Sequence, residues 1–477
     1  MRPETAAGPL GDVDTEEFRA AARRAVDWAA EYLDTVRDRP VMPALKPGDV
    51  RRALPAVPPE EGERLEVIFE DFERLVLPGI THWNHPRFFG YFGITGSTPG
   101  ILAELLIAAL NVNAMLWRTS PAATEVEEVA CDWLRQAIGL DAGFSGVIND
   151  TASSSTLYAL AAARGAVPGL DVRKRGMSGR TLRMYMSEEA HSSVEKAGIV
   201  LGVGQENIVK VPTDASFRMD VQELQRAVRR DRADGHLPFA VVATVGTTAV
   251  TAVDPVPAIA KVCREENLWL HVDAAYGGAA AVLESHRWVL SGCDHADSLV
   301  VNPHKWLFTP IDCSVLYCRH EHMLKRAFSL TPSYLQTGEA ESVRNLMDYG
   351  ASLGRRFRGL KLWFVLRAFG VEGARRRIAA HIEMARQLRS WIEADPGFEV
   401  LAPVEFSTVV FRRLTTDSDN ERIHEAINAS GRALISHADV RGVYALRIAI
   451  GNLRTTLEDV RATWELIKST AAAGVGG

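Results

Sequence analysis

Short apolar runs alternate with longer segments of helical periodicity through the middle of the chain. The apolar runs are GVIN, RMYMS, FAVVATVG, LWLHVD, SLVVN and CSVLYC. Between them lie segments whose apolar residues recur three and four positions apart, such as TLYALAAARGA and PVPAIAKVCREEN. Strands that are apolar on both faces and separated by helices are typical of a mostly parallel sheet covered on both sides. The pattern therefore predicts an α/β domain over residues 96–360.

Two further segments flank this predicted domain. Residues 1–95 contain a helix that begins after Asp14, a candidate N-cap, and then proline-rich connections. This segment has little core of its own, so we expect it to depend on a partner surface. Residues 361–477 contain two long helical patterns, short strands and a closing helix from Thr456, which predicts a small α+β domain.

Composition narrows the class of protein. The 477 residues are 47% apolar and 24% charged with a net charge of -6, which is typical of a soluble globular chain and gives no sign of nucleic-acid binding. The five cysteines lack CxxC spacing, so we expect reduced, packed thiols in a cytoplasmic compartment and no metal site. The N-terminus lacks the apolar segment of a signal peptide. The longest apolar stretch, residues 100–117, contains Glu104 and predicts a buried helix and no membrane span.

Polar and small residues follow several of the predicted strands. Asp273 ends LWLHVD, Thr248 follows VVATVG, and Lys305 follows SLVVNPH. In INDTASSST, Ser153 begins a helix whose backbone N–H groups could hold a phosphate, although such runs more often only cap a helix. His191 begins another helix in EEAHSSVEKAG, where an ordinary capping or core histidine is the alternative. Because the carboxyl ends of parallel strands share one edge of a sheet, we expect these residues to meet there.

Together these residues suit one cofactor. A phosphate cradle, a carboxylate for a ring nitrogen, a histidine that can stack on a ring and a confined lysine are what pyridoxal 5'-phosphate (PLP) requires. Lys305 must lose its proton to react with the cofactor's aldehyde, and burial next to Trp306 lowers the pKa of such an amine. The sequence therefore predicts a PLP site with Lys305 as its covalent anchor.

Six motifs resemble those of the group II PLP-dependent decarboxylases, and especially the aromatic-L-amino-acid decarboxylases: NPHKW, HVDAAYGG, EEAHSSVEKAG, ATVGTT, SPAATEVEE and LGRRFR. The resemblance runs from about residue 15 to the C-terminus. It implies the fold type I architecture of the aspartate aminotransferases and a homodimer whose N-terminal helices wrap over the partner. It also implies that an aromatic L-amino acid is converted to an amine and CO2.

The resemblance further implies roles for individual residues. Lys305 anchors the cofactor, Asp273 pairs with its pyridine nitrogen and His191 stacks on its ring. Thr248 lies near the ring and Ala275 packs against its other face. The residues implied to hold the phosphate or orient the cofactor are Ala152, Ser153, Asn302, His304 and Gly354.

Large apolar side chains predict a pocket for an aromatic ring. No cationic partner for a second substrate carboxylate is evident among them. Two departures from the eukaryotic enzymes indicate a pocket of different shape: residues 93–95 read Gly-Ile-Thr, and only residues 350–352 separate Tyr349 from Leu353. The candidate pocket residues are Trp83, Tyr91, Phe92, Met115 and Trp117.

Tyr334 lies in LTPSYLQTGEAES, a polar segment that predicts a mobile lid. By its residue pattern alone it is an exposed loop tyrosine. The resemblance implies that it closes over the other subunit's site and returns a proton to Cα after CO2 has left.

Three alternatives stay open. The first is an aromatic aldehyde synthase, against which tyrosine at position 334 argues. The second is a decarboxylase of an acidic or imidazole amino acid. The third is a cofactor-binding protein without activity, which the set of Lys305, Asp273 and His191 disfavours.

Overall fold

The computed structural model of the protein describes residues 11–177, 179–330 and 342–473. The chain divides into two compact units. Residues up to 90, residues 415–436 and residues from 454 on form the smaller unit, and residues 91–414 and 437–453 form the larger. The division into residues 1–95, 96–360 and 361–477 rests on sequence patterns and stays a prediction.

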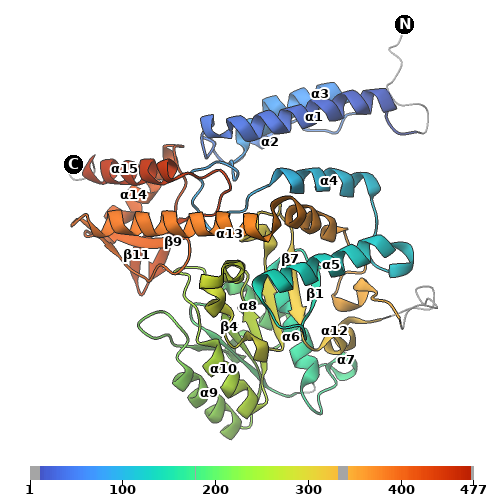
Figure 1. The fold of residues 1–477 in the computed structure, drawn as a ribbon, viewed down its shortest axis with the longest axis vertical. Helices are drawn as coiled ribbons and strands as arrows, with labels where there is room; N and C mark the ends of the chain where they lie inside the picture. Colours follow the sequence, from blue (N-terminus) through green and yellow to red (C-terminus); the bar gives the residue numbers. More distant parts are fainter. Residues whose placement is uncertain (1–10, 178, 331–341, 474–477) are drawn as a thin grey trace. The chain divides into compact units, whose positions relative to one another are not determined.

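The larger unit is built around a seven-stranded sheet (Figure 1). Its strand order is β1-β7-β6-β5-β4-β2-β3. Strand β7 pairs antiparallel with β1 and β6, and the four other pairs are parallel. The predicted mostly parallel sheet is therefore confirmed. The strands are β1 (Ser145–Asn149), β2 (Leu182–Ser187), β3 (Ile208–Val211), β4 (Leu237–Thr244), β5 (Trp269–Asp273), β6 (Ser298–Val301) and β7 (Ser314–Cys318).

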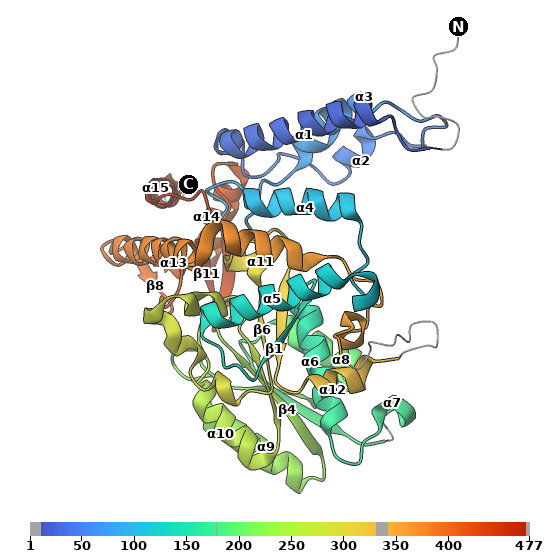
Figure 2. The same cartoon turned by 45° about the vertical axis from the view of Figure 1, so that its right-hand side comes forward.

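Both faces of this sheet are buried, as the apolar strands predict. In β4, Ala240 and Val242 belong to the core formed with α6 and α8, whereas Val241 and Ala243 belong to the core formed with α5, α9 and α10. Figure 2 shows these helices around the sheet. Successive side chains of a strand point to opposite faces, so each central strand contributes to both cores. The bounds are α5 (Pro121–Ile138), α6 (Ala152–Ala166), α8 (Ser192–Val200), α9 (Val221–Ala233), α10 (Val256–Glu266) and α12 (Glu321–Phe328).

The longest apolar stretch, residues 100–117, is α-helical only in its first part, α4 (Thr98–Leu110), and the prediction that it forms a buried helix is wrong. Its exposed leucines have exposed fractions of 39% to 60%, and only Gly100, Ala103 and Ile107 are buried. Among the described residues, no helix is long and apolar enough to cross a membrane. The exposed leucines of α4 are Leu102, Leu105, Leu106 and Leu110.

The C-terminal part of the larger unit matches the predicted mixture of helices and strands. The two predicted helices form α13 (Arg358–Glu393), which is interrupted at Gly370, where φ is +64°. Glycine reaches this left-handed region without a steric penalty, so it marks the break between the two helical patterns. A second sheet has the order β10-β11-β9-β8. Its strands are β8 (Phe398–Val400), β9 (Thr408–Arg413), β10 (Ser436–Val440) and β11 (Val443–Ala449).

The smaller unit begins with α1 (Thr15–Thr35), whose predicted N-cap is confirmed. The Asp14 carboxylate accepts hydrogen bonds from the backbone N–H groups of Glu16 and Glu17, at 2.8 and 3.2 Å. Leu33 is the only fully buried residue of α1. This agrees with the small core expected of the N-terminal segment. The other helices of the unit are α2 (Asp49–Ala53), α3 (Leu65–Asp71), α14 (Asp417–Ala429) and α15 (Leu457–Ala473).

Candidate active site

A cavity of about 160 Å³ lies at the carboxyl ends of the parallel strands of the larger unit. Ten of the predicted site residues line it, although they come from distant parts of the sequence. The parallel strands bring them together because their carboxyl ends meet at the same edge. These residues are Phe92, Ala152, Ser153, His191, Thr248, Asp273, Ala275, Asn302, His304 and Lys305.

The start of α6 forms one end of the cavity. The first backbone N–H groups of a helix have no partner within it, and Thr151, the N-cap residue, gives no side-chain cap. Asn302 Oδ1 and Thr244 Oγ1 are buried and have no hydrogen-bond partner among the described residues. Uncapped N–H groups and buried polar atoms without partners fit a phosphorylated ligand, because they supply a polar cradle that the protein leaves unfilled.

Lys305 lies in the short helix α11 (Pro303–Trp306), which follows β6. Its Nζ is 5.1 Å from the centroid of the Phe92 ring. Burial lowers the pKa of the Lys305 amine, nearby Asp273 opposes the shift, and Arg447 adds to it. The Lys305 amine therefore loses its proton more readily than the amine of a lysine in water, which favours its use as a nucleophile.

Lys305 lies among bulky side chains because the neighbouring Trp306 belongs to a column of stacked aromatic rings. The Trp306 ring stacks on Tyr276 with the centroids 4.8 Å apart, and Tyr276 stacks in turn on Phe92 at 3.9 Å. The Trp306 Nε1–H donates to His381 Nδ1 at 3.0 Å. This column of aromatic rings forms an apolar wall next to Lys305.

His191 is the N-cap residue of α8. Its Nδ1 accepts a hydrogen bond from the Ser193 backbone N–H at 3.1 Å and lies 2.7 Å from Ser193 Oγ. Burial lowers the pKa of His191, Asp273 opposes the shift, and Lys305 adds to it. The imidazole is therefore a neutral, oriented ring at the cavity wall, which suits stacking on a flat ligand.

Asp273 is the last residue of β5 and is buried. Its Oδ1 accepts a hydrogen bond from the Ala275 backbone N–H at 3.1 Å, which fixes the carboxylate at the strand end. His304 accepts a bond from the Cys313 backbone N–H at Nδ1, 2.9 Å away. Burial, together with Lys305, lowers the pKa of His304 to about 3, so this ring is also neutral.

Several residues at the site were not predicted. Thr151, Ser193, Thr244 and Tyr276 also line the cavity. Arg447 lies next to it, with its guanidinium carbon 4.8 Å from the centroid of the Phe92 ring, and burial lowers its pKa to about 10. The signal for Arg447 was present in YALRIAIG, because a charged residue within an apolar strand needs a specific buried environment.

The other predicted residues do not line this cavity within the described part of the chain. Gly354 lines a separate cavity of about 110 Å³ next to Asn149. Met115 packs with Leu116 and Met347. The remaining predicted residues, whose roles also stay predictions, are Trp83 in the smaller unit, the exposed Tyr91, the partly exposed Trp117 and Tyr334, which lies outside the described residues.

The comparisons with known proteins agree with the chemistry expected of this cavity. A conserved-domain model, described as the pyridoxal-dependent decarboxylase conserved domain, matches residues 47–414. The chain belongs to the pyridoxal-dependent decarboxylases. It is 38% identical to the aromatic-L-amino-acid decarboxylase of Sus scrofa, over 96% of this chain and 97% of that protein. It is thus a carboxy-lyase of the aromatic amino acid decarboxylase family, and its cofactor is PLP.

Two solved structures place this pyridoxal-dependent decarboxylase among enzymes with different products. Oryza sativa TDC with PLP and tryptamine superposes with a TM-score of 0.93 at 36% identity, covering 98% of this chain and 99% of that one. Rhodiola rosea 4-hydroxyphenylacetaldehyde synthase superposes with a TM-score of 0.90 at 33% identity, covering 98% and 99%. The predicted fold type I architecture is confirmed.

Proposed function

We propose that the protein converts an aromatic L-amino acid to the corresponding amine and CO2. The observation that carries this proposal is the charge of the cavity. Lys305 is the only lysine or arginine among the described residues that line it, and Phe92 supplies an aromatic face. The guanidinium of Arg447, next to the cavity, donates to the Ala249 and Tyr91 carbonyls. An amino acid with a second carboxylate would need a further cation, so the cavity favours an aromatic side chain over an acidic one.

The residues of the cavity have separate roles in this proposal. When bound, PLP supplies a conjugated ring that takes up the electron pair left as CO2 departs. The Asp273 carboxylate would hold a proton on the ring nitrogen, and His191 and Ala275, which also line the cavity, would hold the ring. Lys305 supplies the neutral amine that anchors the cofactor. The aromatic column of Phe92, Tyr276 and Trp306 excludes water, which favours loss of a carboxylate whose charge is dispersed.

A substrate panel tests the proposed specificity. The holoenzyme is supplied with tryptophan, 5-hydroxytryptophan, DOPA, tyrosine, phenylalanine, histidine and glutamate, and both CO2 and amine are measured. We expect at least one aromatic substrate to be preferred over histidine and glutamate. A preference for glutamate or histidine would disprove the aromatic assignment while leaving decarboxylation intact.

An aromatic aldehyde synthase is the second candidate, because one similar structure is such an enzyme. Tyrosine at position 334 supports amine formation, since a phenol can return the proton to Cα after CO2 has left. In the Tyr334→Phe variant only the hydroxyl is lost. We expect amine formation to fall by roughly 10²–10⁴-fold, the range for a positioned acid. Dioxygen can then react at the unprotonated carbon, so aldehyde, ammonia and hydrogen peroxide should appear along with CO2.

A mixed dimer tests whether Tyr334 acts across subunits. One chain carries Tyr334→Phe and the other carries Lys305→Ala, so one of the two sites combines Lys305 with an intact tyrosine from the partner. We expect roughly half of the normal dimer's activity if sites act independently. If Tyr334→Phe chains alone form amine at the unmutated rate without peroxide, Tyr334 is not the acid, and His304 becomes the next candidate.

We further propose that the protein is a homodimer with its active sites at the subunit interface. Each unit exposes apolar side chains on a helix: the four leucines of α4 in the larger unit, and Phe18 and Val26 of α1 in the smaller. Exposed apolar stripes on helices are typical of interaction surfaces. The five cysteines are free and buried, which supports the proposed cytoplasmic location.

Deleting residues 1 to 90 is expected to give inactive or insoluble chains. The reason is that α1, α2 and α3 bury almost no side chains within the chain itself, so their apolar faces need a partner. Size-exclusion chromatography with light scattering measures the mass of the full and the truncated chain, and amine release measures the activity of both. A truncated chain that is monomeric and fully active would contradict the proposal.

A further inference from the structure

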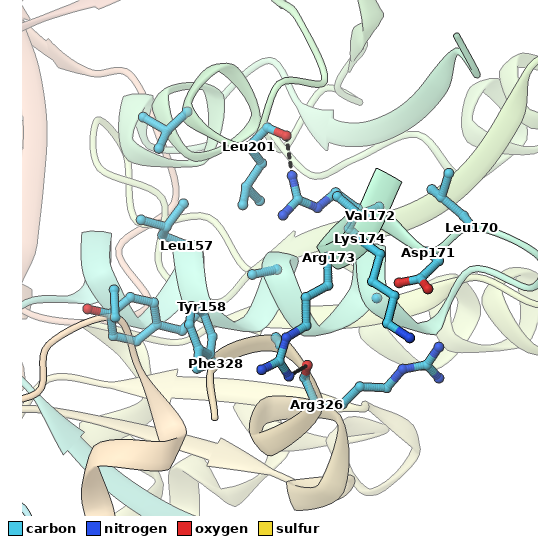
Figure 3. A pocket seen from close by; sticks show the side chains of 16 residues that line it. Leu157, Tyr158, Leu170, Asp171, Val172, Arg173, Lys174, Leu201, Arg326 and Phe328 are labelled. Carbon is cyan, nitrogen blue, oxygen red and sulfur yellow. Dashed lines mark hydrogen bonds between the residues drawn. The ribbon is translucent and has the colours of Figure 1, made fainter. Parts of the chain in front are cut away.

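A second cavity of about 440 Å³ lies in the larger unit, away from the candidate active site (Figure 3). It is bounded by the last turns of α6 and α8, by α7 (Val172–Arg175) and by the end of α12. Helix α6 begins at the candidate active site and has 15 residues. Its residues between Leu157 and Gly165 line the second cavity, whereas Ala152 and Ser153 line the candidate active site, and the two cavities share no lining residue among those described. The second cavity is therefore a distinct site.

One part of this cavity is apolar. Leu157, Ala161 and Leu201 contribute aliphatic surface, and the rings of Tyr158 and Phe328 meet edge to face with their centroids 5.0 Å apart. Figure 3 shows Tyr158 and Phe328 next to each other at one end of the cavity. Such a surface suits the flat or apolar body of a small molecule.

The lining of the cavity also contains an excess of cations. Four of its side chains carry a positive charge, against the single carboxylate of Asp171. Figure 3 shows the charged ends of Lys174 and Arg326 on the same side of the cavity. This local excess of positive charge is unusual in a chain whose net charge is -6. The four cationic residues are Arg164, Arg173, Lys174 and Arg326.

Two of these arginines are held in place by backbone carbonyl groups. Arg164 donates from Nη1 to the Leu201 carbonyl, and Arg173 donates from Nη1 to the Arg326 carbonyl at 3.0 Å. These bonds orient the guanidinium groups and leave other N–H groups unused, since each guanidinium has five. The Arg164 Nε is buried without a hydrogen-bond partner among the described residues.

The other two cations have no partner at all within the described ranges. Neither the Lys174 amine nor the Arg326 guanidinium forms an ion pair or a side-chain hydrogen bond there. Some exposed arginines elsewhere in the described residues do pair with a nearby acid, as Arg226 does with Glu223 at 2.6 Å. Unpaired cations around an apolar cavity repel one another, and an anion bound between them would relieve that repulsion.

We propose that this cavity binds a small organic anion, a carboxylate or phosphate joined to an aromatic or similarly flat body. The anionic head is bound by Lys174 and Arg326, whose charged ends lie on the same side of the cavity, because an ammonium and a guanidinium both pair with carboxylate and phosphate oxygens. The apolar body lies on Leu157, Tyr158 and Phe328. The cavity volume lies within the range of about 300–1,000 Å³ that is usual for small-molecule sites.

Titration calorimetry on the holoenzyme tests the proposal with four probes: phenylacetate, phenyl phosphate, inorganic phosphate and phenylacetamide. We expect phenylacetate or phenyl phosphate to bind, and the tighter of the two identifies the preferred head group. Phenylacetamide has the ring without the charge and should not bind. Inorganic phosphate has the charge without the ring and should bind more weakly than phenyl phosphate.

Variants then assign the binding to this cavity. Lys174→Gln and Arg326→Gln each remove one charge from an exposed side chain, so the fold should be retained, and each should weaken binding by about tenfold. Arg229→Gln is the matched control, since Arg229 is exposed on α9 outside the cavity, and it should leave the affinity unchanged.

Three outcomes overturn the proposal. The first is that neither phenylacetate nor phenyl phosphate binds with a Kd below about 10 mM. The second is that Lys174→Gln and Arg326→Gln bind as tightly as the unmodified chain, which would place the binding elsewhere, including the candidate active site. The third is that inorganic phosphate or phenylacetamide binds as tightly as the charged aromatic probes.

Discussion

Replacing Lys305 by alanine is expected to abolish turnover while leaving the fold largely intact. The side chain lies at the wall of a cavity, so its loss removes a covalent anchor and little core volume. The unmodified chain with PLP should absorb above roughly 400 nm, as lysine-bound PLP does, and borohydride should fix the cofactor on Lys305. The variant should show neither property and should release no amine.

Lys305→Arg separates the covalent role from a purely electrostatic one. Arginine keeps the positive charge near Asp273 and Phe92 but cannot act as a neutral amine, because its pKa stays above about 12. We expect it to be as inactive as the alanine variant, with a circular dichroism spectrum like that of the unmodified chain. Amine formation by Lys305→Ala near the unmodified rate would show that another residue anchors the cofactor.

The central sheet and much of the candidate site could be predicted because both follow from one local rule. Each apolar run long enough to cross the sheet ends in a polar or small residue, and parallel strands bring these ends to a single edge. Asp273, Thr248 and Lys305 were found in this way, and all three line the cavity. Their actual roles cannot be derived from position, and these stay predictions.

Features that depend on distant partners were missed. The short strand β3 lies at the edge of the sheet, where it pairs only with β2. It carries the polar Lys210, so its run of apolar residues is too short to predict a strand. Burial of α4 was predicted wrongly, because apolar composition does not say whether a helix meets its own chain or another molecule. Arg447 reaches the site from the second sheet, over a hundred residues after Lys305, and no local spacing links the two.

The second large effect is expected at Asp273. Asparagine keeps the size of the side chain and an oxygen that can accept the Ala275 N–H, so Asp273→Asn removes the charge and preserves the local geometry. Without the carboxylate, the proton on the cofactor's ring nitrogen loses its counter-charge, which lowers the pKa of that nitrogen. We expect amine formation to fall by roughly 10²–10³-fold, the cost of removing one preorganised electrostatic group. The affinity for PLP should fall as well.

Asp297→Asn is a matched control for this prediction. The Asp297 carboxylate accepts the Leu270 backbone N–H at 2.7 Å, near the first residue of β5, whereas Asp273 is the last residue of the same strand. Both substitutions therefore neutralise a carboxylate that accepts a hydrogen bond from the backbone, but only the Asp273 carboxylate faces the cavity. Initial rates of amine release and PLP titration by absorbance compare the two variants. The control should retain most of its activity and bind PLP normally. If Asp273→Asn did the same, Asp273 would be only a structural residue that closes the end of β5, and the ring nitrogen would need another partner.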